Sequence, residues 1–338
     1  MKVYTCNNCL NPLYFENSIC LNCGHAVGFD PAALTMVTLE PASGYKYCRN
    51  AEYAVCNWLI PATSPSGFCI ACTLNRVIPS LEDNANLVRW KNVEVAKHRL
   101  IYSLLRLHLP FEVTRSGKTE SIIFDFMADA PNGERVMTGH DNGIITINIA
   151  EADEAQRTRN KQDLGERYRT LLGHFRHEIG HFYWDVLIRD RPVIDKYRQL
   201  FGDERKDYSA ALATYYSNGA PADWNQQFVS SYATSHPWED WAETWAHYLH
   251  MMDTLETAWS FGISVDAVEL DESAGISASI PKDPYKVKDF DRLIKRWLPL
   301  CFAVNSMNRS MGHPDFYPFI LSGPVIEKLR FIHGLGNA

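Results

Sequence analysis

Apolar residues recur along the chain with two different spacings, one typical of helices and one typical of strands. Between residues 89 and 108 they recur every three or four positions until Pro110 closes the pattern, which predicts a helix. Residues 122–127 are rich in β-branched and aromatic side chains. In residues 144–149 isoleucine alternates with polar residues, just after the turn signal of residues 141–143. These two segments are predicted strands.

A second helical pattern is predicted to begin with a capping box. Asp163 is followed three residues later by Glu166, so we expect this helix to start near residue 163. Its apolar residues form one stripe between Tyr168 and Val186. Polar residues gather on another face of the same helix, among them His177, Glu178 and His181. The helical spacing therefore collects side chains that could act together.

A third helix is predicted to begin after Pro237 and to reach about Met252 or beyond. Glu239 and Glu243 lie one turn apart on its polar stripe. Its predicted core positions include three tryptophans, Trp238, Trp241 and Trp245. A shorter helix is expected over residues 292–298. The order of one helix, then strands, then further helices predicts an α+β fold rather than alternating βαβ units.

Length and composition are those of a folded globular protein with more than one part. The chain has 338 residues, of which 46% are hydrophobic and 22% charged. No segment approaches the run of about 18 apolar residues that a membrane span needs. The first residues have no apolar core that would serve as a secretion signal. We therefore expect a cytoplasmic protein with no membrane partner.

The charge pattern disfavours nucleic acid as a partner. The net charge is −7, which gives no general attraction to a polyanion. Residues 1–80 are neutral, because four basic residues are matched by four acidic ones: Lys2, Lys46, Arg49 and Arg76 against Glu16, Asp30, Glu40 and Glu52. Binding of nucleic acid by this segment would weaken steeply with salt.

Eight of the nine cysteines lie before residue 73, and the first four are spaced as zinc ligands. Two Cys-x-x-Cys pairs are separated by ten residues, which is typical of a tetrahedral site with four thiolates: Cys6, Cys9, Cys20 and Cys23. Two disulfides are the alternative. A reducing compartment disfavours them.

The next four cysteines are spaced less regularly. Seven, twelve and two residues separate the successive members, Cys48, Cys56, Cys69 and Cys72. One zinc ion held by all four is the favoured interpretation, and buried thiols without metal are the alternative. Both quartets would be closed structural sites, because four protein ligands leave no position for a substrate. We therefore predict a cysteine-rich zinc module over residues 1–80 and a second domain over residues 81–338. Cys301 stands apart and is predicted to be a buried apolar residue.

The pentad of residues 177–181 has the spacing of a catalytic zinc site. His177 and His181 lie one helical turn apart, so each can present a ring nitrogen to one metal ion. Glu178 is rotated from them by about 100°, which places it to reach a metal-bound water as a general base. A third ligand can be a carboxylate from a later helix. Either Glu239 or Glu243 could fill that role, while the other holds a ligand histidine.

These residues carry a resemblance to known metallopeptidases. The His-Glu-x-Gly-His motif with a later Glu-x-x-x-Glu resembles the gluzincin group, and the aromatic residue inside residues 239–243 looks like that of the anthrax lethal factor metallopeptidase group. The resemblance implies that Glu239 is the third zinc ligand and that Glu243 is a supporting residue. It also implies that Tyr232, seven residues before Glu239, stabilises the oxyanion.

A second resemblance covers nearly the whole chain. Residues 171–181 and 237–248 are similar to a bacterial family of zinc-binding metallopeptidases with an N-terminal zinc ribbon. It implies a zincin-like α+β domain over residues 81–338, preceded by a zinc-ribbon module with two four-cysteine sites. It also implies one catalytic zinc ion and up to two structural ones.

The function that follows is zinc-dependent hydrolysis of peptide bonds in a protein or peptide substrate, with Glu178 activating the zinc-bound water. We expect residues 144–149 to hold an extended substrate by edge pairing. The ribbon could bring in a protein partner. The alternative function is a zinc-stabilised protein-interaction module whose peptidase-like site is autoinhibited or inactive. The presence of Glu178 favours the enzyme, because a structural zinc site needs no base.

Overall fold

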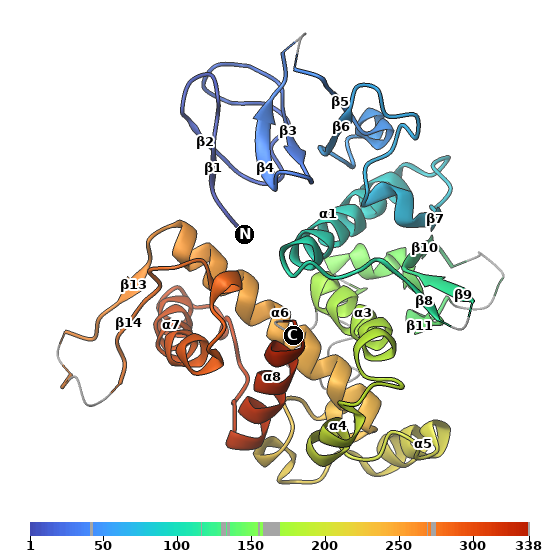
Figure 1. Ribbon diagram of the computed structural model, residues 1–338, viewed down its shortest axis with the longest axis vertical. Coiled ribbons are helices and arrows are strands. Elements are labelled where there is room, and N and C mark those ends of the chain that lie inside the picture. Colours follow the sequence, from blue (N-terminus) through green and yellow to red (C-terminus); the bar gives the residue numbers. More distant parts are fainter. Residues whose placement is uncertain are drawn as a thin grey trace. The chain divides into compact units, whose positions relative to one another are not determined.

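The computed structural model describes residues 1–40, 43–115, 117–129, 133, 136–154, 156–157, 170–268, 270–271 and 275–336. The chain forms two compact units, residues 1–175 and 176–338, and each is described by itself (Figure 1). The chain passes from one to the other within helix α3 (Leu171–Leu187). The predicted boundary near residue 80 lies inside the first unit.

The first unit begins with three short antiparallel hairpins: β1 (Tyr4–Thr5) with β2 (Pro12–Leu13), β3 (Val27–Asp30) with β4 (Thr35–Thr38), and β5 (Tyr45–Tyr47) with β6 (Leu59–Pro61). Their shared core is aromatic. The ring of Phe29 lies 4.7 Å from that of Phe15 and 4.9 Å from that of Trp58. Tyr102 of α1 (Asn84–Arg106) joins them at 5.9 Å from Phe29. The cysteine-rich segment is thus packed on α1 through aromatic rings.

Helix α1 confirms the helix predicted over residues 89–108, and it starts five residues earlier. Asp83 caps it by accepting a hydrogen bond from the backbone N–H of Ala85. The 3-10 turns η1 (Arg49–Tyr53), η2 (Cys72–Leu74) and η3 (Ile149–Ala152) also belong to this unit. η3 packs against α1.

A four-stranded sheet in the first unit has the order β11-β12-β10-β7. Its strands are β7 (Asn75–Val77), β10 (Ile123–Met127), β11 (Gly139–Asp141) and β12 (Ile144–Asn148). β10 runs parallel to both β7 and β12, while β11 and β12 form an antiparallel hairpin. Asn142 and Gly143 both have positive φ, as a two-residue type I′ turn requires. A separate hairpin joins β8 (Glu112–Arg115) and β9 (Lys118–Ser121).

The expected edge pairing of a substrate with residues 144–149 is wrong. β12 is an inner strand, because β10 occupies one side of it and β11 pairs with Ile144–Thr146 on the other. On that side, the backbone of Ile144–Thr146 is already used by β11 and is not open to a substrate. The alternation of isoleucines indicated a strand but not the identity of its neighbours.

The predicted start of the histidine-bearing helix also changes. Asp163 and Glu166 lie outside the described residues. Thr170 is not helical, and its Oγ1 accepts a hydrogen bond from the N–H of Gly173, so the described helix starts at Leu171 with Thr170 as its cap. Phe175 in the first turns of α3 packs at 5.6 Å from Phe124 of β10.

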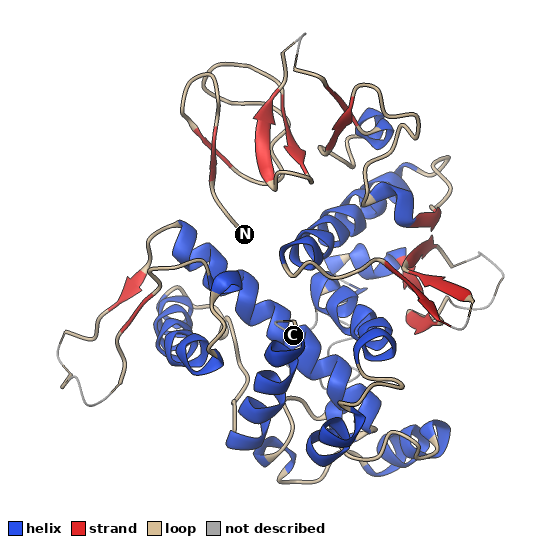
Figure 2. Cartoon of the chain, viewed as in Figure 1, coloured by secondary structure: helices blue, strands red, loops and turns tan. Residues whose placement is uncertain are grey.

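The second unit is mostly helical (Figure 2). Its helices are α4 (Ile194–Phe201), α5 (Tyr208–Asn218), α6 (Pro237–Ser260), α7 (Phe290–Ser310) and α8 (Gly323–Leu335). Short elements between them are η4 (Trp224–Gln226), η5 (Tyr232–Thr234), η7 (Pro284–Lys286) and the hairpin of β13 (Ser264–Val265) and β14 (Ala278–Ser279). α6 is the central element, with α4, α7, α8 and η5 packed against it.

Helix α6 confirms the helix predicted after Pro237, and α7 is longer than predicted. α7 continues through Pro299, because the buried side chains of Trp297 and Leu300 on either side hold that turn in place. Cys301 on α7 is buried, as predicted, and burial raises the pKa of its thiol.

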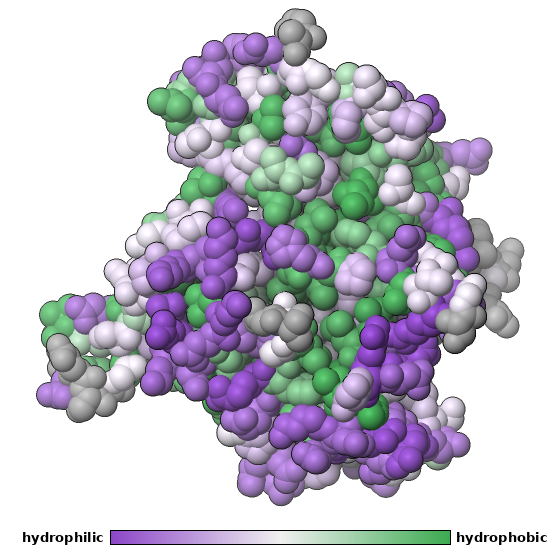
Figure 3. Space-filling view, viewed as in Figure 1, coloured by the Kyte–Doolittle hydropathy of each residue, from purple (hydrophilic) through white to green (hydrophobic). Residues whose placement is uncertain are grey.

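Among the described residues, no helix is long and apolar enough to cross a membrane. The face of the second unit that Figure 3 presents is largely hydrophilic, with apolar side chains between the polar ones.

Candidate metal centre

Two histidines on α3 approach each other as ligands of one metal ion would. His177 and His181 lie one turn apart, and their Nε2 atoms are 3.2 Å apart. Both residues are buried. In a tetrahedral zinc site with Zn–N distances of 2.0–2.1 Å, neighbouring ligand atoms are about 3.3 Å apart. The separation of the two nitrogens fits that geometry.

The first turn of α6 brings a carboxylate to the same point. Glu239 Oε2 lies 3.0 Å from His177 Nε2, and Glu239 Oε1 lies 3.7 Å from His181 Nε2. Glu239 is 1% exposed, and its Oε2 is a buried atom with no hydrogen-bond partner in the described part of the chain. A buried carboxylate oxygen with no donor is costly, and a metal ion held with the two nitrogens would satisfy it. His177, His181 and Glu239 therefore form a candidate metal site.

The histidines and the carboxylates of this centre stabilise each other's charged forms. Burial opposes ionisation of Glu239, yet the adjacent imidazoles of His181 and His177 lower the pKa of its carboxyl to about 2. Burial likewise opposes protonation of His177, but the carboxylates of Glu239 and Glu243 raise the pKa of its ring well above the usual value. The centre attracts a cation, which can be a proton or a metal ion.

Glu243 holds the other side of the His177 ring. Its Oε1 lies 2.7 Å from His177 Nδ1, and its Oε2 accepts a hydrogen bond of 2.5 Å from Ser230 Oγ. With Nδ1–H donated to Glu243, the Nε2 lone pair of His177 faces Glu239 and His181. This is the usual contact by which a carboxylate orients a metal-ligating histidine.

Two tyrosines and Glu178 surround the three candidate ligands. Tyr208, the first residue of α5, donates a hydrogen bond of 2.7 Å to Glu239 Oε1. Burial and the negative charges of Glu239 and Glu178 raise the pKa of Tyr208, so the Glu178 carboxylate lies within electrostatic reach of this phenol. The ring of Tyr232 lies 6.0 Å from that of His177. Burial and Glu239 also raise the pKa of Tyr232. Both phenols therefore keep their protons.

A close approach of α3 and α6 sets the distance between the ligands. Gly180 allows it, because a Cβ atom there would lie 3.1 Å from Ala242 Cα and 3.3 Å from Trp245 Cβ. The indole Nε1 of Trp241 donates a hydrogen bond of 2.8 Å to the carbonyl of Gly180. Trp238 is only half-buried, and its ring lies 4.0 Å from that of His181. The prediction that Trp238 belongs to the core is therefore wrong, whereas Trp241 and Trp245 are buried as predicted.

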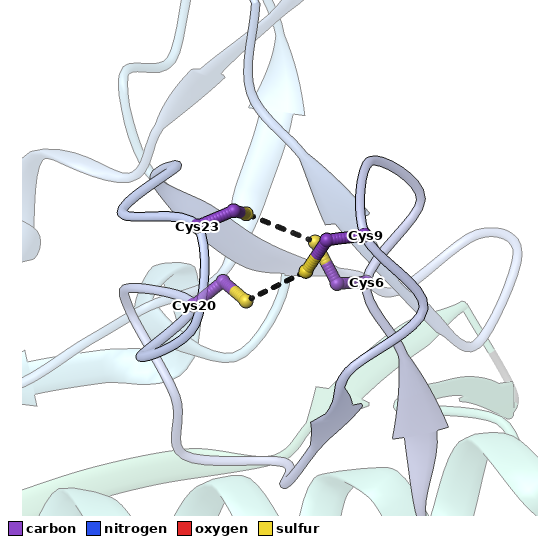
Figure 4. A group of neighbouring side chains, drawn as sticks. All are labelled: Cys6, Cys9, Cys20 and Cys23. Carbon is purple, nitrogen blue, oxygen red and sulfur yellow. Dashed lines mark hydrogen bonds between the residues drawn. The ribbon is translucent and has the colours of Figure 1, made fainter.

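The first cysteine quartet in the first unit has the geometry of a four-thiolate site (Figure 4). The sulfurs of Cys6 and Cys23 are 3.7 Å apart, and those of Cys9 and Cys20 are 3.6 Å apart. Sulfurs around a tetrahedral zinc ion with Zn–S distances of about 2.3 Å are about 3.8 Å apart. A hydrogen bond from the side chain of Asn8 lowers the pKa of Cys23 to about 5, which favours the thiolate. All four cysteines are free of disulfides.

The second quartet is also gathered within one small space, despite its irregular spacing. Its members, Cys48, Cys56, Cys69 and Cys72, form a candidate metal site and are free of disulfides. The sulfurs of Cys56 and Cys69 are 3.8 Å apart. His98 of α1 lies beside this cluster, with its Nε2 3.3 Å from the sulfur of Cys56.

Comparison with known proteins agrees with this arrangement. Residues 86–335 match the family described as "Putative zinc-binding metallo-peptidase", and residues 3–83 match a zinc-ribbon domain family. The first match covers well over half of the chain. The chain belongs to this metallopeptidase family.

Relatives of this chain occur in mycobacteria. A protein of Mycobacterium tuberculosis strain H37Rv and one of Mycobacterium bovis, each bearing the name of an uncharacterized protein, are 42% identical to it over 335 residues. The aligned region is 98% of this chain and 94% of each relative. No solved structure matches the chain.

Sequence reasoning found the candidate ligands of this family member but missed several residues around them. It placed His177, His181 and Glu239 together, and it expected a supporting contact from Glu243. It missed Tyr208, which lies 31 residues before Glu239 in a segment with no motif. Other missed residues are Ser230, Trp238, and Arg176, which donates hydrogen bonds to His250 and Asp253 of α6. The spacing of these residues along the chain carried no signal.

Proposed function

We propose that this member of the metallopeptidase family is an active zinc-dependent peptidase that hydrolyses peptide bonds in proteins or peptides. The observation that carries the proposal is the convergence of His177, His181 and the buried carboxylate of Glu239 within reach of one metal ion. Glu178 follows His177 in the chain, acts electrostatically on Tyr208 beside this centre, and is not one of the three candidate ligands. A zinc site that only stabilised the fold would need no additional carboxylate such as Glu178. A zinc ion held by these three residues would polarise the scissile carbonyl and activate a water molecule.

The protein's own residues have distinct parts in this proposal. Glu178 accepts the proton of the attacking water and returns it to the leaving amine. Glu243 keeps His177 in the tautomer that offers Nε2 to the ligand set. Tyr232, whose phenol stays protonated because burial raises its pKa, is proposed to donate a hydrogen bond to the oxyanion.

Replacement of the proposed base tests this function. In Glu178→Gln the three candidate ligands are unchanged, so we expect the variant to keep the zinc of this centre. Its cleavage of a generic unfolded protein should fall by about 10²–10⁴-fold, the usual contribution of a general base. Metal content by mass spectrometry and cleavage by gel assay are the two measurements.

Glu327→Gln is the matched control, because it makes the same change on α8 at a side chain that is 55% exposed. It should keep both zinc and activity. Cleavage by Glu178→Gln at the wild-type rate would refute the assigned base. Wild-type protein with a full metal complement and no cleavage of any substrate would favour an interaction module with an inactive site.

A further inference from the structure

A surface cavity of about 550 Å³ lies in the second unit, beside the candidate metal centre. Helix α5 forms one wall through residues at the spacing of a single helix face: Ala211, Thr214, Tyr215 and Asn218. Tyr208 precedes Ala211 by one turn on this face, and its hydroxyl contacts Glu239. The cavity therefore begins about one helical turn from Tyr208, whose hydroxyl contacts the proposed metal ligand Glu239.

The opposite wall leads directly to the same ligand. It is formed by residues 234–237, which come just before Glu239 in the chain. None of the eleven residues of α5 is buried, although the helix contains alanine, leucine and tyrosine. The inner face of α5 is only partly packed, because the ring of Tyr215 contacts that of Tyr232 at 5.7 Å while the face also borders the cavity. A substrate segment could fill this space.

The charged groups of the cavity are unbalanced. Lys206 lines it, and no aspartate or glutamate does. Within the described ranges Lys206 has no carboxylate at ion-pair distance, because Asp203 pairs with Arg205 and Glu204 pairs with Arg198. The cavity therefore presents a positive charge with no internal partner.

The other polar groups of the cavity suit a negatively charged ligand. His236 donates a hydrogen bond from Nε2 to the carbonyl of Lys206 and accepts one at Nδ1 from the N–H of Trp238, so both ring nitrogens are already used within the protein. Ser235 is 7% exposed, and its buried Oγ has no hydrogen-bond partner in the part of the chain that the structure describes. Asn218 adds an amide to the lining. A carboxylate could accept a hydrogen bond from the ammonium of Lys206 and, once the Ser235 side chain rotates toward the cavity, from its hydroxyl.

We propose that this cavity is a substrate subsite and that it selects a carboxylate near the scissile bond. The carboxylate would come from an aspartate or glutamate of the substrate, or from its free C-terminus. The inference rests on the proposed peptidase function, because it places the cavity next to the reacting bond.

The test compares cleavage-site preferences of zinc-loaded wild-type protein and of variants on a mixed peptide library read by mass spectrometry. We expect an acidic residue to be favoured at one position flanking the cut, by about three- to tenfold over its amide. In Lys206→Gln the ratio of cleavage beside an acidic residue to cleavage beside its amide should be close to one. In Lys206→Glu a basic residue should be favoured at that position. Lys196→Gln, an exposed lysine on α4 outside the cavity, should keep the wild-type preference. If the preference disappears when peptide C-termini are amidated, the terminal carboxylate is its source.

A binding measurement keeps the subsite testable if cleavage is not observed. Zinc-loaded Glu178→Gln is titrated with two labelled peptide pools that differ only in glutamate against glutamine, and fluorescence anisotropy is recorded. The glutamate pool should bind more tightly, and the double variant Glu178→Gln/Lys206→Gln should remove the difference. Equal binding of the two pools, or an acidic preference that survives Lys206→Gln, overturns the subsite. Absence of cleavage together with selective binding overturns the peptidase function alone.

Discussion

At the scale of single residues, the candidate centre depends on how the two oxygens of Glu239 are divided. Oε1 accepts the hydrogen bond of Tyr208, while Oε2 has no hydrogen-bond partner in the described ranges and lies 3.0 Å from His177 Nε2. Oε1 is thus fixed by Tyr208, while Oε2 faces the ring nitrogen of His177, where a cation shared by the two groups would bind. A carboxylate held in this way is predisposed to bind a metal ion through one oxygen only.

The first prediction concerns Tyr208. In Tyr208→Phe the carboxylate of Glu239 loses the donor at Oε1 and can rotate. We expect the zinc affinity of the centre to fall by about 10–100-fold, as is usual when a group that orients a ligand is removed. Competition with a chromophoric chelator measures it.

Tyr216→Phe is the control, because Tyr216 lies on the same helix and is 65% exposed. It should bind zinc as the wild type does. Equal affinities for the two variants would mean that Tyr208 does not position Glu239.

At the scale of elements, the ligands are brought together by the crossing of α3 and α6. Helical spacing on each element places the histidines one turn apart on one helix and the glutamates one turn apart on the other. The sequence therefore predicted which residues face the centre. It could not predict the distance between the helices, which is set by Gly180 against Ala242, two residues without conspicuous chemistry.

The second prediction tests that crossing. In Gly180→Ala the new methyl group would lie 3.1 Å from Ala242 Cα, so α6 must move away from α3. We expect a loss of about 1–3 kcal/mol in the free energy of unfolding and weaker zinc binding. Thermal denaturation and chelator competition measure the two effects.

Gly334→Ala on α8 provides the comparison, because nothing lies within 4 Å of the added atom. Its effect should be neutral or stabilising, since alanine favours a helix more than glycine does. A stable Gly180→Ala protein with unchanged zinc affinity would show that the close approach is not needed.

The third prediction concerns His247, which lies one turn after Glu243 on α6. His247 is buried and shares a hydrogen bond of 2.8 Å with Tyr317 Oη, and burial lowers its pKa to about 4. The unfolded chain takes up a proton near pH 6.5, before the folded state does, so this residue destabilises the fold as pH falls from about 6.5 to 4. The loss in the free energy of unfolding approaches about 3 kcal/mol near pH 4.

Urea denaturation of chelator-treated protein at several pH values tests this effect without a contribution from metal release. His247→Gln should lose less stability than the wild type over that pH window, and the two curves should run in parallel above pH 7. Parallel curves throughout the window would mean that His247 does not titrate there.

At the scale of the whole molecule, the two cysteine quartets and the centre on α3 and α6 differ in how completely the protein surrounds the ion. Each cysteine quartet offers four sulfurs, whereas the centre on α3 and α6 offers three ligand atoms. An ion with three protein ligands keeps a position open to water and to chelators.

The fourth prediction follows from this difference. Protein grown with sufficient zinc should contain three zinc ions per chain, and a chelator should remove one of them readily. A variant in which His177 and His181 are both alanine should contain two ions, both resistant. Mass spectrometry of native protein counts them. Two ions in both the wild type and the variant would mean that the centre on α3 and α6 binds no zinc.

The sequence was most informative where chemistry and local spacing coincide. The α+β class, the Cys-x-x-Cys pairs and the pentad on α3 depend on residues close together in the chain. Contacts between distant segments were missed, as with β11, which occupies the side of β12 expected to receive substrate. Tyr208 was not predicted for the same reason, because only the fold brings α5 to Glu239.

The environment of the second cysteine quartet limits where the zinc-ribbon segment can be separated from the rest of the chain, in evolution or by engineering. Glu94, Lys97 and His98 lie on α1, beyond the zinc-ribbon match that ends at residue 83, and all three are buried. His98 lies against the sulfur of Cys56, and the charges of Glu94 and Cys72 raise the pKa of the buried Lys97 against the effect of burial. A gene fusion that transferred residues 1–83 alone would leave these partners behind. A segment that is to keep the second cysteine quartet in its present surroundings must therefore include α1 as well as residues 1–83.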